Sequence, residues 1–430
     1  MPFNTALSGI RAANTDLKVT GNNIANASTT GFKNSRAEFG DVYASSLIGS
    51  GSSAPGSGVN LQKIRQQFSQ GNLNFTENQL DLAINGAGMF IVSDQGDMLY
   101  GRDGTFGLDK DGYIVNNTGS NLQGFVADGQ ENVGGTLENL RVQVENQAPN
   151  TTTEINTSFN LDSRQKVLDP NLPPDPVAYF DHEDASTYNH ATSVKVYDSL
   201  GNPHTLSQYF VKVHDEDNPP MAPSTNVNVW NVHYRIDGQP PAASPADHTT
   251  LTFNADGSLE SVDGVANMGV FNIPNYALDN GAEPLEIEMD YANSTQFGST
   301  FSVETLDQDG YSTGRLAGID IDEQGFIFAR FTNGRAQTIG QVALANFNNL
   351  EALKPVGSTL WAQTAASGEL VVGTPGSASL GDIQAGALEE SNVDLSEQLV
   401  KLIIAQRNFQ ANSKTIETAN QTTQTIINLR

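Results

Sequence analysis

Apolar and small uncharged side chains recur in steps of four and three from residue 392 to residue 430, and no Gly or Pro interrupts this stretch. This spacing predicts one long helix with a largely apolar stripe. Asn392 or Asp394 can cap its start. Polar residues at some stripe positions, such as Gln406 and Ser413, cost stability but can fix the register of a partner helix. The apolar stripe positions are Leu395, Leu399, Leu402, Phe409, Ile416 and Ile427.

The N-terminal residues repeat the same spacing, with Asn14 and Gly21 between the apolar positions. A single helix cannot bury such a stripe against itself, so we expect the two terminal helices to pair as a coiled coil. The alternative is two independent helices on the surface of the body between them. The apolar positions of the N-terminal stripe are Phe3, Leu7, Ile10, Leu17 and Ile24.

Between the helices the hydrophobic period changes to two, and turn sequences such as DQGD, DKDG and NNTG separate the short apolar runs. This predicts a mainly β protein with helical termini in a nested order. We expect a terminal helical domain at 1–30 and 392–430, and linkers at 31–71 and 376–391. We expect a discontinuous antiparallel β domain at 72–149 and 296–375, and an inserted acidic outer β domain at 150–295.

One segment, 49–58, is rich in Gly and Ser and predicts a flexible link. Its glycines, Gly49, Gly51, Gly56 and Gly58, are candidate hinge residues. The segment also holds a weak echo of a dinucleotide-binding loop. However, Pro55 and further Gly and Ser residues follow where a helix should begin, which argues against that function.

Composition narrows the class of protein. The 430 residues carry 22 basic and 49 acidic side chains, a net charge of −27. This balance argues against nucleic acid and against anionic membrane surfaces as partners. The chain has no Cys, which excludes disulfides and cysteine metal sites. We find no pattern of a cleaved signal peptide and no apolar run of the ~20 residues that span a bilayer.

Candidate chemistry is sparse. All six His residues fall between His182 and His248, but their spacing matches no tight ligand motif, so we interpret them as scattered surface residues. Part of a calcium-binding loop is matched by Asp307, Asp309 and Gly310. The match lacks Glu at the twelfth position of the loop, so a turn is the simpler interpretation. Two carboxylates at a suitable distance could resemble the catalytic pair of a glycosidase, but with so many acidic residues such a pair is expected by chance. We therefore expect no catalytic residue, no cofactor and no metal.

Four blocks carry a resemblance to a known family. ALSGIRAANTDLKVTGNNIANASTTGFKNSRAEF (6–39) and SNVDLSEQLVKLIIAQRNFQANSKTIETANQ (391–421) resemble the terminal signatures of bacterial flagellar rod and hook proteins. Residues 80–125 and 314–347 are similar to β blocks of the same family. The resemblance implies a homopolymer of many copies in which the eleven apolar positions of the two helices serve self-assembly. It also implies export through the flagellar apparatus without a cleaved signal, and an extracellular location.

The length and the acidic insertion favour the hook branch of this family, whose members form a curved tube that passes torque from motor to filament. The distal rod proteins, which are shorter, are the alternative within the family. A secreted β-rich hydrolase or adhesin is the alternative from another class, and it leaves the terminal helices without a role. The partners implied are the distal rod, the hook cap, the hook–filament junction proteins and the export apparatus, with no nucleic acid and no membrane insertion.

Overall fold

The chain divides into two compact units. The first comprises Met1–Val144, Ala317–Arg330 and Ala336–Arg430, and the second comprises Glu145–Leu316 and Phe331–Arg335. The expected outer domain, 150–295, lies inside the first range of the second unit. The computed structural model describes residues 2–42, 56–127, 133–143, 145–168, 180–213, 228–240, 248–266, 269–377 and 379–428.

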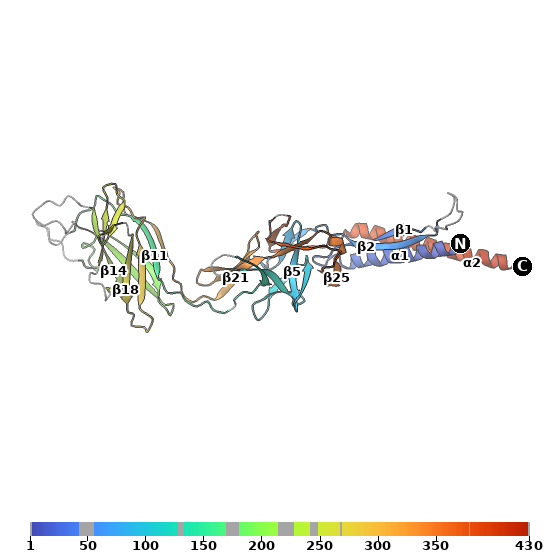
Figure 1. The fold of residues 1–430 in the computed structure, drawn as a ribbon, viewed down its shortest axis with the longest axis horizontal. Helices are drawn as coiled ribbons and strands as arrows, with labels where there is room; N and C mark the ends of the chain where they lie inside the picture. Colours follow the sequence, from blue (N-terminus) through green and yellow to red (C-terminus); the bar gives the residue numbers. More distant parts are fainter. Residues whose placement is uncertain are drawn as a thin grey trace, which may run out of the picture. The chain divides into compact units, whose positions relative to one another are not determined.

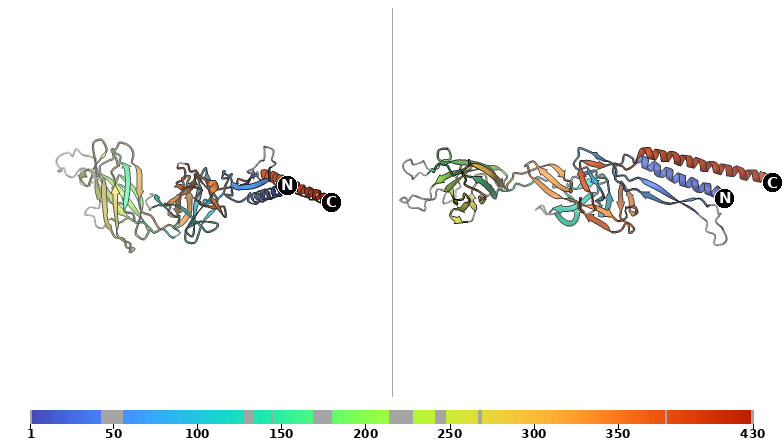
Figure 2. Two further views of the ribbon diagram at one scale, coloured as in Figure 1. Left: turned by 45° about the vertical axis from the view of Figure 1, so that its right-hand side comes forward. Right: turned by 90° about the horizontal axis from the view of Figure 1, so that it is seen from above.

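Two helices and a β-hairpin form one end of the first unit. Helix α1 spans Pro2–Ala25 and helix α2 spans Leu395–Asn428. Strands β1 (Ser35–Asp41) and β2 (Val59–Gln66) pair antiparallel, with a bulge beside Phe39. Helix α1 packs against α2 and also against the hairpin (Figure 1), and Figure 2 shows both contacts from other sides.

The ranges expected to be linkers contain regular structure. The range 31–71 holds β1 and β2, and 376–391 holds β28 (Asp382–Ala385) and β29 (Ala387–Glu389). β28 pairs with β4 (Leu82–Asn85), and β29 pairs with β3 (Leu73–Phe75). These strands are short or lack a clean alternation of apolar and polar residues, so their backbone pairing was invisible in the pattern.

A large sheet makes the body of the first unit, and its strands come from both sides of the insertion. β23 pairs with β9, and β24 pairs with β5, so the two sequence halves complete one sheet as expected. Ile91, Tyr100, Phe347 and Trp361 share its core. The strands are β5 (Met89–Asp94), β6 (Asp97–Gly101), β7 (Phe106–Leu108), β8 (Ile114–Asn116), β9 (Asn121–Ala127), β10 (Val133–Asn139), β21 (Leu316–Ile321), β22 (Phe326–Phe331), β23 (Ala336–Val342), β24 (Leu344–Phe347), β25 (Lys354–Gly357), β26 (Leu360–Ala362) and β27 (Leu370–Gly373), with a 3-10 turn at Leu350–Ala352.

The second unit is a β-sandwich whose two sheets share one core. Trp230 and Tyr234 from one sheet meet Phe159 from the other, and the Tyr234 and Tyr291 hydroxyls lie 2.9 Å apart. The first sheet has the order β12-β13-β14-β15-β16-β17, and the second has the order β18-β19-β11-β20. β11 and β19 run parallel, while the other named pairs are antiparallel. The strands are β11 (Glu154–Asn160), β12 (His190–Tyr197), β13 (Pro203–Val213), β14 (Val229–Ile236), β15 (His248–Phe253), β16 (Leu259–Val262), β17 (Val265–Ala266), β18 (Val270–Tyr276), β19 (Leu285–Asp290) and β20 (Ser302–Gln308).

A buried carboxylate fixes the turn between β12 and β13. Asp198 accepts hydrogen bonds from the backbone N–H groups of Leu200 and Asn202 and from the side-chain amides of Asn202 and Asn280. Burial raises the pKa of Asp198, but the bonds from Asn202, Asn280 and His204 outweigh this and bring it to about 2. The carboxylate therefore stabilises the fold only in its ionised form.

Asp198→Ala should lower the free energy of unfolding of the second unit by about 2–3 kcal/mol at neutral pH, because several part-buried hydrogen bonds to a charged acceptor are lost. Since the folded pKa lies below the ordinary value, this contribution is present above about pH 4 and is lost as the pH falls towards 2. Urea unfolding at a series of pH values checks the result. Asp279→Ala, at an exposed neighbouring position, is the control; a difference between variant and parent that does not shrink with falling pH would contradict the assignment.

Candidate functional site

The terminal helices pair antiparallel. At one end of the pair the Asn23 side-chain amide donates to Oε1 of Gln398 at 3.1 Å, and both side chains are buried. At the other end Gly9 lies against Asn412, so closely that a Cβ on Gly9 would stand 2.5 Å from Oδ1 of Asn412. Residue numbers rise along one helix as they fall along the other. The expected pairing of the two helices is confirmed.

The buried line between the helices lies one residue away from the expected apolar stripe. On α1 the buried positions include Ala6, Ala13 and Thr20, which are seven residues apart. On α2 they include Gln398 and Ala405, again seven apart. Small side chains allow the two backbones to approach, and Gly9 is the extreme case because it has no Cβ. The pair inside one chain therefore uses small and polar residues, and the larger apolar residues lie beside it.

Many of the eleven residues expected to serve assembly are consequently open to solvent. Leu399 is 50 % exposed and Ile427 is 66 % exposed, and Phe3, Leu395 and Phe409 are exposed as well. The others, Leu7, Ile10, Leu17, Ile24, Leu402 and Ile416, are half-buried. Sequence spacing missed three further apolar residues of α2, Val400, Ile403 and Ile404, which are also exposed. A helix that is apolar on most sides is normally buried on most sides.

The C-terminal third of α2 has a different surface. No charged residue occurs between Thr418 and Asn428. The hydroxyls of Thr418, Thr422 and Thr425 each donate to the carbonyl oxygen four residues earlier, as do those of Thr415 and Thr423. Because these hydroxyls already donate their hydrogens to carbonyl oxygens of the same helix, the threonines present methyl groups and no strong hydrogen-bond donor to the solvent. This end of α2 is exposed and polar but uncharged.

A buried charge network holds the base of the helix pair, which we call the root. Glu389 accepts from Lys33 Nζ at 2.6 Å with one carboxylate oxygen and from Arg102 at 2.9 Å with the other. All three side chains are nearly or fully buried. Glu389 also accepts from the backbone N–H of Gly71, and Lys33 donates to the carbonyl oxygen of Ser69. Burial lowers the pKa of Lys33, and the charge of Glu389 opposes that shift.

The network ties together segments that are remote in sequence. It joins the chain just after α1, the chain just before β3, the inner sheet and the chain just before α2. The sequence pattern does not single out Lys33, Arg102 or Glu389, because isolated charges in a β-rich stretch look like surface residues. The only signal was that Lys33 and Arg102 stand in blocks that carry the family resemblance, whereas Glu389 lies just before the C-terminal block.

Two side chains at the start of α2 have separate tasks. Asp394 caps the helix, since its Oδ1 accepts from the N–H groups of Ser396 and Glu397. Asn392 instead bridges the root: its oxygen accepts from the N–H of Asn34, and its amide donates to the carbonyl oxygens of residues 67 and 69. Of the two expected caps, Asp394 is therefore the one used.

The candidate hinge glycines that the structure describes are not at the root. Gly49 and Gly51 lie outside the described residues. Gly58 adopts φ +115° at the end of the hairpin, where a Cβ would stand 2.2 Å from the hydroxyl oxygen of Ser8 in α1. Gly56 has open space around it. The described glycines thus stand at the hairpin end beside α1 rather than between α1 and the inner β domain, and a hinge at this segment stays a prediction.

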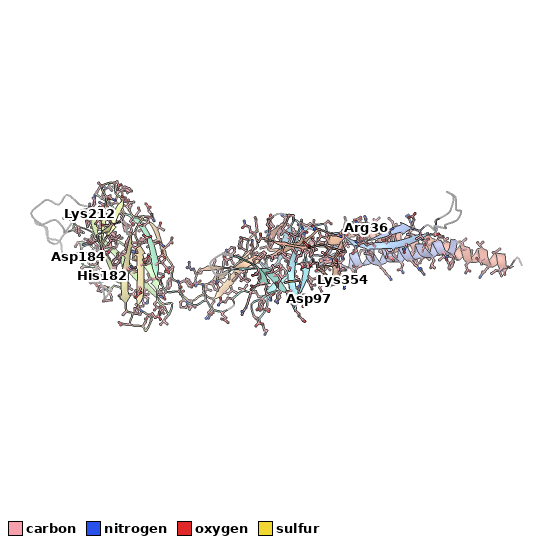
Figure 3. The ribbon with its side chains drawn as sticks, viewed as in Figure 1. Arg36, Asp97, His182, Asp184, Lys212 and Lys354 are labelled. Atoms are coloured by element: carbon pink, nitrogen blue, oxygen red, sulfur yellow. The ribbon has the colours of Figure 1, made fainter. Side chains whose placement is uncertain are left out.

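The side chains of the histidine region and of the calcium-like turn contact other parts of the fold through ring stacking and hydrogen bonds. His182 and Asp184 lie in the second unit (Figure 3), where Phe180 stacks on His233 at 4.0 Å between ring centroids. Asp309 accepts from the N–H groups of Thr153 and Glu154 and so fastens two chain segments. Within the described ranges, neither helix is both long enough and apolar enough to cross a membrane.

Four protein families match successive parts of the chain. Residues 3–33 match the family described as "Flagella basal body rod protein", and 83–162 match "Flagellar hook protein FlgE/F/G D1 domain". Residues 160–311 match "Flagellar basal body protein FlaE D2 domain". Residues 384–429 match "Flagellar basal body rod FlgEFG protein C-terminal".

Curated relatives match over the full length. The chain is 39 % identical over 437 residues to the flagellar hook protein FlgE of Escherichia coli strain K12, covering all of both chains. It is 37 % identical to the hook protein of Salmonella typhimurium, again over all of both chains, and 31 % identical to that of Borreliella burgdorferi, over 99 % of this chain and 98 % of the relative. Among solved structures, the flagellar hook protein FlgE2 of Helicobacter pylori covers 74 % of this chain and all of its own, with a TM-score of 0.54 at 16 % identity, which is a likeness of fold.

Proposed function

Since the chain belongs to the flagellar hook protein FlgE family, we propose that its copies polymerise through their terminal helices into the curved, flexible tube of the flagellar hook. A hook subunit is a structural protein and not an enzyme. The full-length relatives are hook proteins, so the distal rod alternative, like the hydrolase or adhesin, loses its support.

The observation that carries this proposal is the exposed apolar surface of α2. The pair within one chain buries Ala405 and Gln398, while Leu399 and Ile403 stay exposed. Water-exposed apolar surface of this extent on one helix is costly unless another surface covers it. In a homopolymer the covering surface belongs to further copies of the same chain, and those contacts supply the driving force for assembly.

The remaining parts of the proposal follow from this role. The helices line the tube, the inner β domain (72–149 and 296–375) forms its wall, and the acidic domain (150–295) forms its outer layer. The partners at the ends of the tube are the distal rod, the hook cap and the hook–filament junction proteins. The chain leaves the cell through the flagellar export apparatus without cleavage, which places it outside the cell.

Leu402→Asp and Phe409→Asp should each abolish tubes, because a carboxylate in an apolar contact between copies loses its water without gaining a partner. Neither change should lower the melting temperature of the inner sheet, since both side chains lie on the helix and neither is fully buried in the single chain. Sedimentation and electron microscopy measure polymer, and calorimetry measures the melting temperature.

Asn420→Asp is the matched control. It adds the same charge to the same helix at an exposed polar position between Ile416 and Ile427, with almost no change of shape. Tubes should form from this variant. Normal tubes from both apolar-to-Asp variants would refute assembly through this helix.

A further inference from the structure

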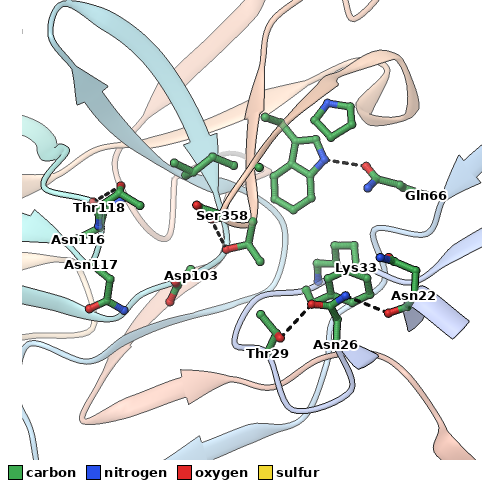
Figure 4. Close-up of a pocket in the computed structure, with 16 residues that line it drawn as sticks. Asn22, Asn26, Thr29, Lys33, Gln66, Asp103, Asn116, Asn117, Thr118 and Ser358 are labelled. Atoms are coloured by element: carbon green, nitrogen blue, oxygen red, sulfur yellow. Dashed lines mark hydrogen bonds between the residues drawn. The ribbon is translucent and has the colours of Figure 1, made fainter. Parts of the chain in front are cut away.

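A polar pocket of about 370 Å³ opens beside the root in the first unit. Figure 4 shows that its walls come from the end of α1, from the turn after β8 and from the turn between β25 and β26. Most of the side chains that line it are amides and hydroxyls, which offer oxygen acceptors. They include Asn22, Asn26, Thr29, Asn117 and Ser358.

Asp103 contributes the carboxylate of this pocket. Its Oδ1 accepts from the backbone N–H of Thr105 at 3.1 Å and from the Thr105 hydroxyl at 2.8 Å. Burial raises the pKa of Asp103, and the neighbouring charge of Asp81 raises it further. Lys33 also lines the pocket, but it pairs with Glu389. Within the described ranges no basic group forms an ion pair with Asp103.

A half-buried carboxylate without a counter-charge is a cost to the single chain. Burial removes part of its water and so weakens its solvation, and the two hydrogen bonds from Thr105 offset only part of that loss. Groups whose environment disfavours their charged form are common at sites that bind something. The missing complement is a cation, because the pocket supplies oxygen acceptors around a negative charge.

The helix pair carries basic side chains without acidic partners. Arg11 and Lys18 lie seven residues apart on α1, so they share one face, and both are exposed. In the part of the chain that the structure describes, neither forms an ion pair, whereas Lys401 and Lys414 of α2 pair with Glu397 and Glu417. Arg11 and Lys18 therefore form a basic face on α1 that is free to meet an acidic site on another molecule.

We propose that the pocket at Asp103 receives a basic side chain, Arg11 or Lys18, from α1 of a second copy of this chain. The contact rests on the proposed self-assembly and adds a polar, orienting joint to the apolar helix contacts. Apolar surfaces can slide past one another, but a cation in a pocket lined by oxygen acceptors fits in one position. The joint therefore sets the register between copies.

The test exploits a difference of sign between the single chain and the polymer. Asp103→Asn keeps Oδ1 as the acceptor for Thr105 and removes only the charge. The single chain should melt at the same or a higher temperature, because an unpaired carboxylate has been neutralised. The critical concentration for assembly should rise about tenfold, the effect expected of losing one desolvated charge pair. Asp97→Asn, which removes an exposed charge of the same unit (Figure 3), should change neither quantity.

Reversing the charge of each basic residue shows which of the two enters the pocket. Arg11→Asp or Lys18→Asp should raise the critical concentration by a similar factor. Combining whichever of these variants has that effect with Asp103→Lys should bring the critical concentration most of the way back. An unchanged critical concentration for Asp103→Asn, or a lowered melting temperature, would overturn the proposal. So would normal assembly from both α1 variants. If these variants still form normal tubes, the joint at Asp103 is refuted but assembly through the terminal helices is not. If the parent protein itself never polymerises, both proposals are refuted.

Discussion

Glu389→Gln should lower the free energy of unfolding of the first unit by about 3–5 kcal/mol, because it leaves two buried cations without their counter-charge. Lys33 and Arg102 are almost fully buried, and both of their charges point at this one carboxylate. The amide of Gln offers one acceptor oxygen where the carboxylate offered two. Differential scanning calorimetry should therefore show a large fall in the melting temperature of this unit with little change in the second.

Two comparisons make this prediction specific. Glu390→Gln removes the charge of the next residue, which is exposed, and should change the unfolding free energy by less than about 0.5 kcal/mol. Combining Lys33→Met with Glu389→Gln should cost less than the sum of the two single changes, because one stranded charge disappears. Strictly additive losses would mean that the two side chains do not depend on each other.

Gly31→Ala should have the second large effect, about 3 kcal/mol or more of lost stability in the same unit. Gly31 has φ +68°, and a Cβ there would stand 2.5 Å from the backbone nitrogen of Asp103. Its N–H also donates to the carbonyl oxygen of Glu389 at 2.8 Å. Backbone atoms cannot swing aside as a side-chain end can, so relieving the clash requires moving the root itself. Denaturant unfolding measures the loss.

Gly21→Ala is the matched change with the opposite expected sign. Gly21 lies inside α1 with nothing within 4 Å of the position its Cβ would take. Alanine at an open helical position should stabilise the helix by up to about 1 kcal/mol. Similar losses from the two substitutions would show that helix flexibility, and not the tight approach at Gly31, governs stability here.

The parts of the fold that repeat were predictable from sequence. The two terminal helices follow from a seven-residue spacing, and the strands of the second unit follow from alternation such as that of Trp230, Val232 and Tyr234. The return of the chain into the first sheet also agreed with the structure, since β23 pairs with β9. Periodicity predicts these features because it is a property of each segment by itself.

The remaining features depend on contacts between segments. The apolar stripe pointed to Leu7 and Leu399 as the contact between the helices, whereas the structure buries Ala6 and Gln398. Hydrophobicity alone cannot separate the face that a helix uses within its chain from the face that it offers to another chain. The root and the pocket at Asp103 were missed for a similar reason: single charges acquire meaning only when remote segments come together.

The ion pair between Lys33 and Glu389 joins residues 356 positions apart, and this separation has a consequence for folding kinetics. Contacts between distant residues form late, because a long loop must close, at a cost in entropy, before the contact can stabilise the fold. During synthesis from the N-terminus, Lys33 and Arg102 are added to the chain long before Glu389. Until that residue arrives, the core at the root would enclose two cations and no anion, so it stays open and hydrated. The order of synthesis thus delays closure of the first unit to the last part of the chain, and a chain that stops short of residue 389 remains an open substrate for proteases.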